Sequence, residues 1–379
     1  MLCMVFMFIT VACIVICLVY YHIGCRGDKQ KKLVTSNLIC ALASAFFDWL
    51  GSTGGFIDPV FSANYYPFLV LNLMLIFVFL YRFLTNICGL GNKWKTLFLH
   101  FGIPLLIVAG LMVWSATVPF GLRVYFLSEK TAPVPEGYAP FAFFYRNISL
   151  IFYLYFIIYA CKAWRIIQQY KKVIGNFSSD AERTRLHWAK FLWWTVVLMV
   201  PAPLFVTFPQ FSNPYTDLLA LVCFFTLSMG EIVVVYNLAK GNYVLYVPEK
   251  TVEVQRSKSG MAKEEQLIEV IPVTRKKLET YLREKKPYLN PKLLITDVAS
   301  SLLTNRTYLS NFINDEYKMN FSYFINRYRL EEVERLKKMP ENKDCAINDL
   351  ILMAGFNTYR SYLRVKKERE TQLQAEKRA

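Results

Sequence analysis

The chain has 379 residues, of which 55% are apolar and 16% aromatic, and these proportions are high for an ordinary soluble protein. Its formal net charge is +16, which suits a partner such as nucleic acid or an anionic membrane surface. The nine cysteines form no C-x-x-C pair, which argues against a disulfide framework and against a cysteine-bound zinc ion.

Seven apolar segments each approach the roughly 20 residues that an α-helix needs to cross a bilayer. They lie at about residues 1–20, 33–53, 66–88, 97–117, 141–163, 188–207 and 217–238. We therefore expect a seven-helix transmembrane bundle in residues 1–240, a linker at 241–271 and a helical C-terminal domain at 272–379.

The distribution of Lys and Arg among the connections predicts the orientation of the bundle. The first, third and fifth connections are basic, whereas residues 54–65 and 208–215 contain no Lys or Arg. Because basic loops stay on the cytoplasmic side, the N-terminus is expected outside and the C-terminal domain in the cytoplasm. The predicted location is the inner (cytoplasmic) membrane of the cell, as a multi-pass protein.

A few residues in or near the predicted spans are unusual for a membrane environment. Asp48, Arg146 and Glu231 are ionisable, so we expect Asp48 to pair with Arg146 and Glu231 to be protonated or hydrogen-bonded. They are structural contacts or the best candidates for a sensing site. Gly51 and Gly55 form a G-x-x-x-G pattern, which is typical of helix dimerisation and suggests a homodimer.

The C-terminal domain begins with a helix-turn-helix pattern. Apolar residues recur at helical spacing through residues 295–302, and Asn305 is suited to cap a second helix. The buried face of that second helix is expected to carry Tyr308, Leu309, Phe312 and Ile313. This combination predicts two short helices joined by a tight turn.

A long amphipathic helix and a second helix-turn-helix pattern follow. Asn320 is expected to cap the long helix, and Pro340 to end it. In the second pattern, residues 347–353 form the short helix, Gly355 supplies the turn and Asn357 caps the last helix.

Two such units joined by a long helix resemble the DNA-binding domain of the AraC/XylS transcription regulators. The resemblance covers roughly residues 275–367, including Tyr-Leu-Ser at 308–310, Asn-Arg-Tyr-Arg-Leu-Glu-Glu at 326–332 and Ala-Gly-Phe at 354–356. The sequence departs from the family pattern at several positions. Ile351 replaces a small residue at a helix crossing, Lys366 replaces a core aromatic and the Thr-Pro-containing ending is absent, so the second helix-turn-helix is expected to be loosely packed or to bind phosphates more than bases. Lys318 stands in place of a glycine and Leu294 in place of a capping Thr.

The resemblance also implies which side chains meet double-stranded DNA, because a helix in the major groove presents its outward residues to base edges. The first unit contributes the predicted contacts Arg306, Thr307, Ser310, Asn311 and Asn314. The second unit contributes Tyr359, Arg360, Leu363 and Arg364.

No pattern in the sequence points to catalysis, a metal or a cofactor. His22, His100 and His187 are isolated, and no phosphate-binding glycine loop is present. We therefore expect an all-α, membrane-integral transcription regulator that responds to an unknown small-molecule or protein signal. Two alternatives stay open: a seven-span receptor whose tail binds protein, and a transporter or membrane enzyme with a regulatory tail.

Overall fold

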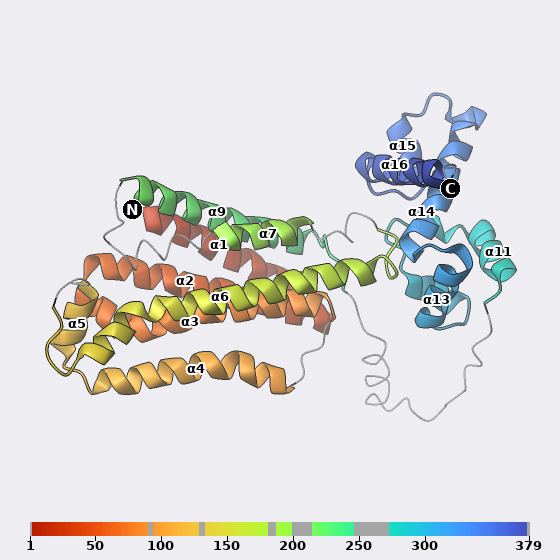
Figure 1. The fold of residues 1–379 in the computed structure, drawn as a ribbon. Coiled ribbons are helices and arrows are strands. Elements are labelled where there is room, and N and C mark those ends of the chain that lie inside the picture. The colour runs from red at the N-terminus through yellow and green to blue at the C-terminus, as the bar shows by residue number, and fades with distance from the viewer. Residues whose placement is uncertain are drawn as a thin grey trace. The chain divides into compact units, whose positions relative to one another are not determined.

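The computed structural model describes residues 2–89, 94–128, 133–180, 187–198, 214–245 and 273–376 (Figure 1). Its elements are helical throughout these ranges, and a single antiparallel bridge between Ser178 and Leu294 is the β-type pairing among them. The chain divides into two compact units. The first comprises Met1–Ile167 and His187–Leu245, and the second comprises Gln168–Leu186 and Tyr246–Ala379.

The first unit is built from long apolar helices. Their bounds are α1 Leu2–Ile23, α2 Lys29–Ile57, α3 Pro59–Ile87, α4 Trp94–Ala116, α5 Phe120–Ser128, α6 Ala139–Ile174, α7 His187–Leu198 and α9 Pro214–Ala239. The end of α6, from Gln168 onward, belongs to the second unit. Within the described residues, four of these helices contain stretches long and apolar enough to cross a membrane: Val5–Ile23, Ala63–Ile87, Thr96–Ala116 and Ala139–Lys171. Shorter apolar stretches lie at Trp188–Leu198 in α7 and Phe224–Ala239 in α9.

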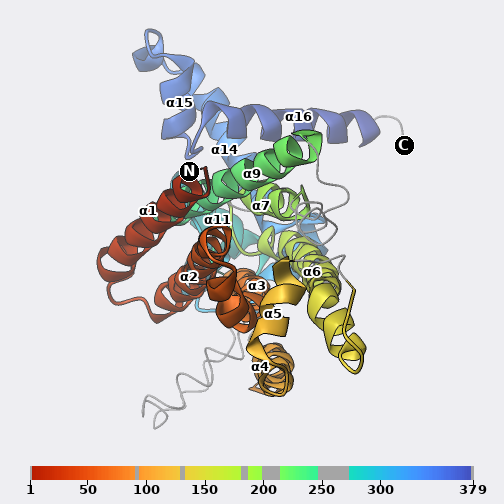
Figure 2. The same ribbon diagram turned by 90° about the vertical axis from the view of Figure 1, so that its left-hand side faces the viewer.

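Within the first unit these helices run alongside one another (Figures 1 and 2). Helix α2 packs between α1 and α3, α1 also contacts α9, and α9 contacts α7. Helix α6 joins α7 back to α3, through a Trp193–Ala160 hydrogen bond of 2.9 Å and a Phe77–Phe156 ring contact. Helix α4 packs against the outer side of α3.

Helix α4 shows how this unit suits an apolar surrounding. Phe98, Leu106 and Val113 are 74%, 73% and 71% exposed, so large apolar side chains cover its outer surface. Such a surface is unfavourable in water and favourable in lipid, where every helical amide is already satisfied within the helix. The exposed face of α4 therefore agrees with a membrane location.

Some sequence predictions for the first unit differ from the structure or concern residues outside the described ranges. Helix α5 lies in a connection for which the sequence predicted no helix. Residues 199–207 of the sixth predicted span, the connection at 208–213 and most of the linker, residues 246–271, lie outside the described residues. The complete seven-span bundle stays a prediction.

The second unit holds two sets of short helices around one long helix. Its elements are α11 Arg275–Lys285, η3 Pro287–Leu289, α12 Ile295–Ser301, α13 Arg306–Tyr317, α14 Phe321–Lys337, η4 Pro340–Asn342, α15 Ile347–Met353 and α16 Tyr359–Glu376. Asn305 caps α13 and Asn320 caps α14, each accepting a hydrogen bond from the third helical amide, as the sequence predicted. The 3₁₀ turn η4 begins at Pro340, directly after α14 ends.

The two short helices α12 and α15 end in the same way. Leu303 after α12 and Gly355 after α15 both adopt positive φ, of 54° and 90°. In each case the next amide bonds back to the third-last carbonyl of the helix: Thr304 to Ala299 at 2.9 Å and Phe356 to Ile351 at 3.2 Å. This is the hydrogen bonding of a Schellman turn, and it gives both helix-turn-helix motifs the same tight turn.

The second helix-turn-helix has a closed core, contrary to the loose packing predicted from Ile351 and Lys366. Ile351 is fully buried, and the cluster around it is formed by Leu330, Val333, Leu336, Leu350, Ala354, Phe356, Tyr362 and Val365. Lys366 is exposed and takes no part in it. Val365 is buried in the cluster instead, and Phe356 packs edge-on against Tyr362.

The predicted cap at Asn357 was wrong. Thr358 precedes α16, and its hydroxyl accepts a hydrogen bond from the Ser361 amide at 3.1 Å. The Asn357 amide instead donates to Asp180 at 2.8 Å. Asn357 is thus available for a contact outside its own helix.

Gly355 is expected to tolerate no side chain. A Cβ there would lie 2.4 Å from the Tyr288 carbonyl oxygen, on a backbone with φ of 90°. Gly355→Ala should destabilise the second unit by about 2–3 kcal/mol, measured by denaturant unfolding of the full chain in detergent. Gly355→Asn tolerates positive φ better but meets the same carbonyl, so it should not restore stability.

Leu303→Gly provides the matched variant at the equivalent turn. Leu303 is 61% exposed, so glycine there removes left-handed strain without removing a packed side chain. We expect its stability to equal or exceed that of the wild type. A loss of stability in Leu303→Gly would show that the left-handed backbone at this turn carries no strain that glycine relieves.

Candidate nucleic-acid interface

Helix α13 carries the predicted DNA contacts of the first helix-turn-helix. Leu309, Ile313 and Tyr317 are buried along its inner side. On the opposite side Thr307 and Asn311 are exposed. A helix anchored in this way holds its outer side chains in a fixed direction, as reading a groove requires.

The other predicted residues of α13 lie between these two faces. Ser310 and Asn314 are half-buried at the edge of the outward face. Arg306 is half-buried as well, and its guanidinium carbon lies 5.5 Å from the centre of the Phe177 ring. Arg306, predicted to point away from the core, therefore contacts Phe177 from outside α13. Tyr308, predicted to be buried, is 37% exposed because Tyr317 supplies the inner aromatic instead.

Helix α16 is arranged similarly in the second helix-turn-helix. Tyr359, Arg360 and Leu363 are exposed, whereas Tyr362 and Val365 are buried beneath them. Arg364 is half-buried and lies 3.9 Å from Glu368, one turn further along α16. The outward face of α16 is thus aromatic, apolar and basic, and that of α13 is polar and neutral.

The two helix-turn-helix motifs correspond position by position. Ile295 and Ile347 begin their short helices, and Leu303 and Gly355 form their turns. Both pairs are separated by 52 residues (347 − 295 and 355 − 303). By the same offset Thr307 matches Tyr359 and Asn311 matches Leu363. The repeat places side chains of different chemistry at equivalent points.

Helix α14 buries polar residues that the sequence analysis missed. Asn326, Arg329 and Glu332 are 3%, 2% and 6% exposed. Buried polar groups require partners, and these three lie one turn apart along the helix. Their spacing was visible in the sequence, but only the fold shows which groups surround them.

Glu332 is held by basic side chains. Its carboxylate accepts two hydrogen bonds from Arg335, at 2.6 and 2.8 Å, and lies 3.4 Å from the Lys286 ammonium. The Arg335 hydrogen bonds and these two positive charges lower the pKa of Glu332, against the opposing effect of burial. Burial and the nearby Glu332 charge raise the pKa of Tyr288 to about 12.

The three ionisable residues predicted in or near the membrane spans do not contact one another within the described ranges. The Thr10 hydroxyl donates to Glu231 at 2.8 Å, so Glu231 is hydrogen-bonded as expected. Asp48 forms no ion pair with Arg146 in the described part of the chain, and its Oδ1 is buried without a hydrogen-bond partner there. The Arg146 guanidinium lies 5.4 Å from the centre of the Phe126 ring.

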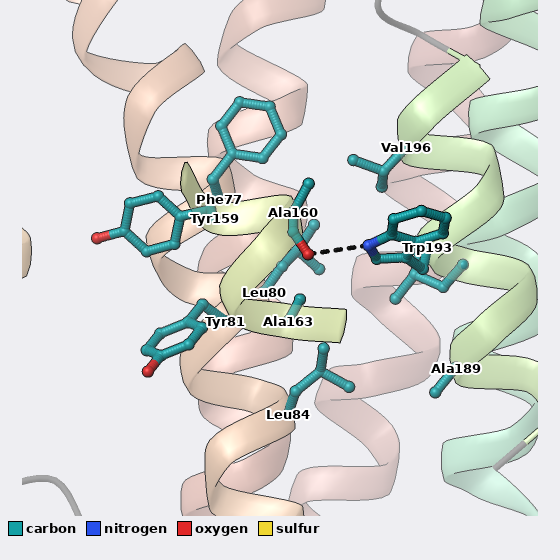
Figure 3. Close-up of a pocket in the computed structure, with 11 residues that line it drawn as sticks. Phe77, Leu80, Tyr81, Leu84, Tyr159, Ala160, Ala163, Ala189, Trp193 and Val196 are labelled. Atoms are coloured by element: carbon teal, nitrogen blue, oxygen red, sulfur yellow. Dashed lines mark hydrogen bonds between the residues drawn. The ribbon is translucent and has the colours of Figure 1, made fainter. Parts of the chain in front are cut away.

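A small apolar pocket also lies in the first unit, between α3, α6 and α7 (Figure 3). Its lining is Phe77, Leu80, Tyr81, Leu84, Tyr159, Ala160, Ala163, Ala189, Leu192, Trp193 and Val196. The Trp193 indole crosses it to bond the Ala160 carbonyl. Alanines on two facing helices leave the space, and no charged group lines it.

Metal chemistry has no candidate among the described residues, where no group of three or more His, Cys, Asp or Glu side chains could hold an ion. Comparison of the chain with protein-family models, with curated proteins and with solved structures found no match.

The Glu332 contacts predict a pH-dependent stability. Because the folded-state pKa is below the ordinary value of 4.5, the stabilisation is complete above that pH and is lost as pH falls through the folded pKa. Glu332→Gln should cost about 1–2 kcal/mol at pH 7, since Arg335 is partly exposed and solvent screens the pair. The difference from the wild type should shrink below pH 4.5, measured by hydrogen exchange of α14 peptides at matched pH.

Glu334→Gln is the control on the same helix. Glu334 pairs with Lys337 at 2.8 Å but its side chain is 58% exposed, so its loss should change stability little. If both variants lose the same stability at pH 7, the buried network has no special role.

Proposed function

We propose that this chain is a membrane-integral transcription regulator, whose second unit binds double-stranded promoter DNA while its first unit lies in the lipid bilayer. The second unit resembles the AraC/XylS DNA-binding domain in the motifs described above. The apolar helices of the first unit support a multi-pass location in the cytoplasmic membrane, with the DNA-binding unit on the cytoplasmic side.

One observation carries this proposal: the repeated short helix, Schellman turn and longer helix, 52 residues apart. In both copies an apolar inner face fixes the longer helix, and side chains suited to DNA face outward. On α13 these are Thr307 and Asn311, and on α16 Tyr359 and Arg360. A repeat of this kind fits two successive segments of major groove better than a single protein-binding surface.

The two helices are suited to different parts of DNA. The Asn311 side chain can form two hydrogen bonds to an adenine edge, and Thr307 can contact a base or a thymine methyl group. Arg360, Lys366 and Lys367 are positively charged and exposed, so α16 is suited to guanine or to phosphates. We infer that α13 supplies most of the base selectivity and that α16 supplies much of the affinity.

The first unit would supply the input. Glu231, Asp48 and Arg146 are its candidate sensing residues, and the α3–α6–α7 pocket offers an apolar site for a small molecule. A homodimer through Gly51 and Gly55 would place two DNA-binding units on one operator. The signal is a small molecule or protein that favours one arrangement of the membrane helices.

Selection from a random duplex library tests the proposal. The full chain in lipid nanodiscs is expected to enrich a defined motif, with an affinity that falls steeply as salt rises because counterions leave the DNA on binding. Recovery of unenriched duplexes only would contradict DNA reading and favour a tail that binds protein.

Two substitutions separate reading from general attraction. Asn311→Ala should cost about 1–3 kcal/mol on the selected duplex and relax the preference at its own base pair. Lys366→Ala should weaken binding to all duplexes alike and reduce the salt dependence by about one counterion. Unchanged base preference in Asn311→Ala would mean that another face of α13 meets the DNA.

A further inference from the structure

Residues 175–180, which follow α6 directly, are packed into the second unit; we call them the docked loop. Phe177, Ser178, Ser179 and Asp180 are each no more than 5% exposed. Loops between helices usually lie at the surface, and serine and aspartate are mostly exposed. A connection with three consecutive buried polar residues therefore has partners that satisfy it.

Its backbone pairs with two helix starts. The Ser179 amide donates to the Leu293 carbonyl at 3.0 Å and the Ile295 amide donates to the Phe177 carbonyl at 3.0 Å. The Ser322 amide donates to the Gly175 carbonyl at 2.9 Å. Ile295 begins α12 and Ser322 lies in the first turn of α14, where amides have no partner within their own helix. The docked loop supplies these missing acceptors.

The Arg329 side chain fastens the loop to α14. Its guanidinium donates to the Ser179 carbonyl and hydroxyl, at 3.1 and 2.9 Å, and to the carbonyls of Tyr288 and Asn290, both at 2.7 Å. A fifth bond, of 3.0 Å, goes to Asn326. Burial lowers the pKa of Arg329 to about 10, while the nearby Asp180 charge opposes this shift.

The docked loop also contacts both helix-turn-helix units through side chains. Phe177 lies under the guanidinium of Arg306, the first residue of α13. Asp180 accepts a hydrogen bond from Asn357, two residues before α16. A run of six residues thus contacts α12, α13, α14 and the start of α16.

We propose that the docked loop fixes the orientation of α13 relative to α16 and is the point at which the membrane unit controls DNA reading. This inference deepens the proposed function and rests on it. Both reading helices are attached to α14 through their own cores, and the loop adds a second attachment to each. With its own core as the single attachment, each reading helix could still rotate relative to α14. The additional contact with the docked loop restricts that rotation.

The chain offers a direct route for the control. Helix α6 is continuous from Ala139 to Ile174, and the docked loop begins at the next residue. The covalent connection to the reading helices runs through residues 246–272, whereas the docked loop reaches them through hydrogen bonds and side-chain contacts. A change in α6 therefore reaches the docked loop through a helix without any intervening linker.

A consequence concerns release of the C-terminal domain. Cleavage between the two units after residue 245 would yield a fragment without the docked loop. Arg329, Ile295 and Ser322 would then lose partners, and the two reading helices would lose their second attachment. The intact chain, rather than such a fragment, is expected to read DNA with fixed spacing.

Hydrogen exchange on the full chain in nanodiscs tests the loop without DNA. Wild-type peptides covering 175–180 and the starts of α12 and α14 should exchange slowly, and Ser179→Pro should speed all three at least tenfold. Peptides of α11, which buries Leu278 and Leu282, should stay unchanged and report that the unit is folded. Unchanged exchange at α12 and α14 in Ser179→Pro would overturn the proposal.

Ser179→Ala is the milder variant if the proline prevents folding. It removes the hydroxyl bonds to Leu293 and Arg329 and keeps the backbone pairing, so a smaller increase, about threefold, is expected at the same peptides. Ser301→Ala is its control, because Ser301 is exposed on α12 and bonds only within that helix.

A DNA experiment tests the control of spacing. Two half-sites selected by the wild type are separated by inserted base pairs, and binding is measured for each spacer. Asp180→Ala removes the acceptor of the Asn357 hydrogen bond and should accept spacers that the wild type rejects by tenfold or more, whereas Asp349→Ala, an exposed substitution in α15, should behave as wild type. Identical spacer preference in Asp180→Ala would overturn the proposal.

The two experiments separate the two claims. If the wild type selects no DNA but Ser179→Pro loosens α12 and α14, the proposed function fails while the loop stands as the constraint on both helices. If DNA is selected and neither variant has an effect, the function stands and the loop proposal fails.

Discussion

A buried guanidinium sets the requirements for the second unit. Arg329 is 2% exposed and carries five donors, so it needs acceptors from the protein in place of water. It finds them on η3, on the turn before α12, on α14 itself and on Ser179. Because charge-assisted hydrogen bonds are directional and costly to leave unmade, these segments are held in one arrangement.

The same arrangement explains why one short helix suffices in each helix-turn-helix. Helices α12 and α15 have seven residues each and would be unstable alone. Schellman turns close their C-terminal ends, and the docked loop supplies an acceptor to the first amide of α12. Ile351 of α15 is buried against α14, and Val298 of α12 is fully buried. Local hydrogen bonds and tertiary burial therefore act together in placing the longer helices.

The first unit has the opposite kind of surface, with large apolar side chains such as Phe98 and Leu106 exposed. Its interior contacts are largely aromatic: Phe141 stacks on Tyr145, and the hydroxyl of Tyr66 reaches the Tyr145 carbonyl at 2.9 Å. The Thr10–Glu231 hydrogen bond joins the first and last of its described helices. In an apolar surrounding such a bond has few competing partners, so it can determine how two helices meet.

The sequence by itself determined the local structure of this protein. Apolar periodicity placed the helices, Asn305 and Asn320 identified two caps, and Gly355 identified a turn, because each depends on residues a few positions apart. The four spans at the N-terminus, after Tyr65, after Thr96 and after Ala139 followed from length and composition alone. The outward positions of Thr307 and Asn311 followed from the same periodicity, whereas those of Tyr359 and Arg360 followed from the resemblance to the AraC/XylS domain.

Only the tertiary structure decided the contacts between distant segments. The predicted cap at Asn357 failed because its side chain bonds Asp180, and Arg306 turned toward Phe177, both of them far away in the sequence. The loop at 175–180 carries no pattern of its own, since its serines are common loop residues and their buried partner, Arg329, lies 150 residues later. Periodicity indicates which face of a helix is buried. The residues that cover that face are distant in the sequence, so only the tertiary structure identifies them.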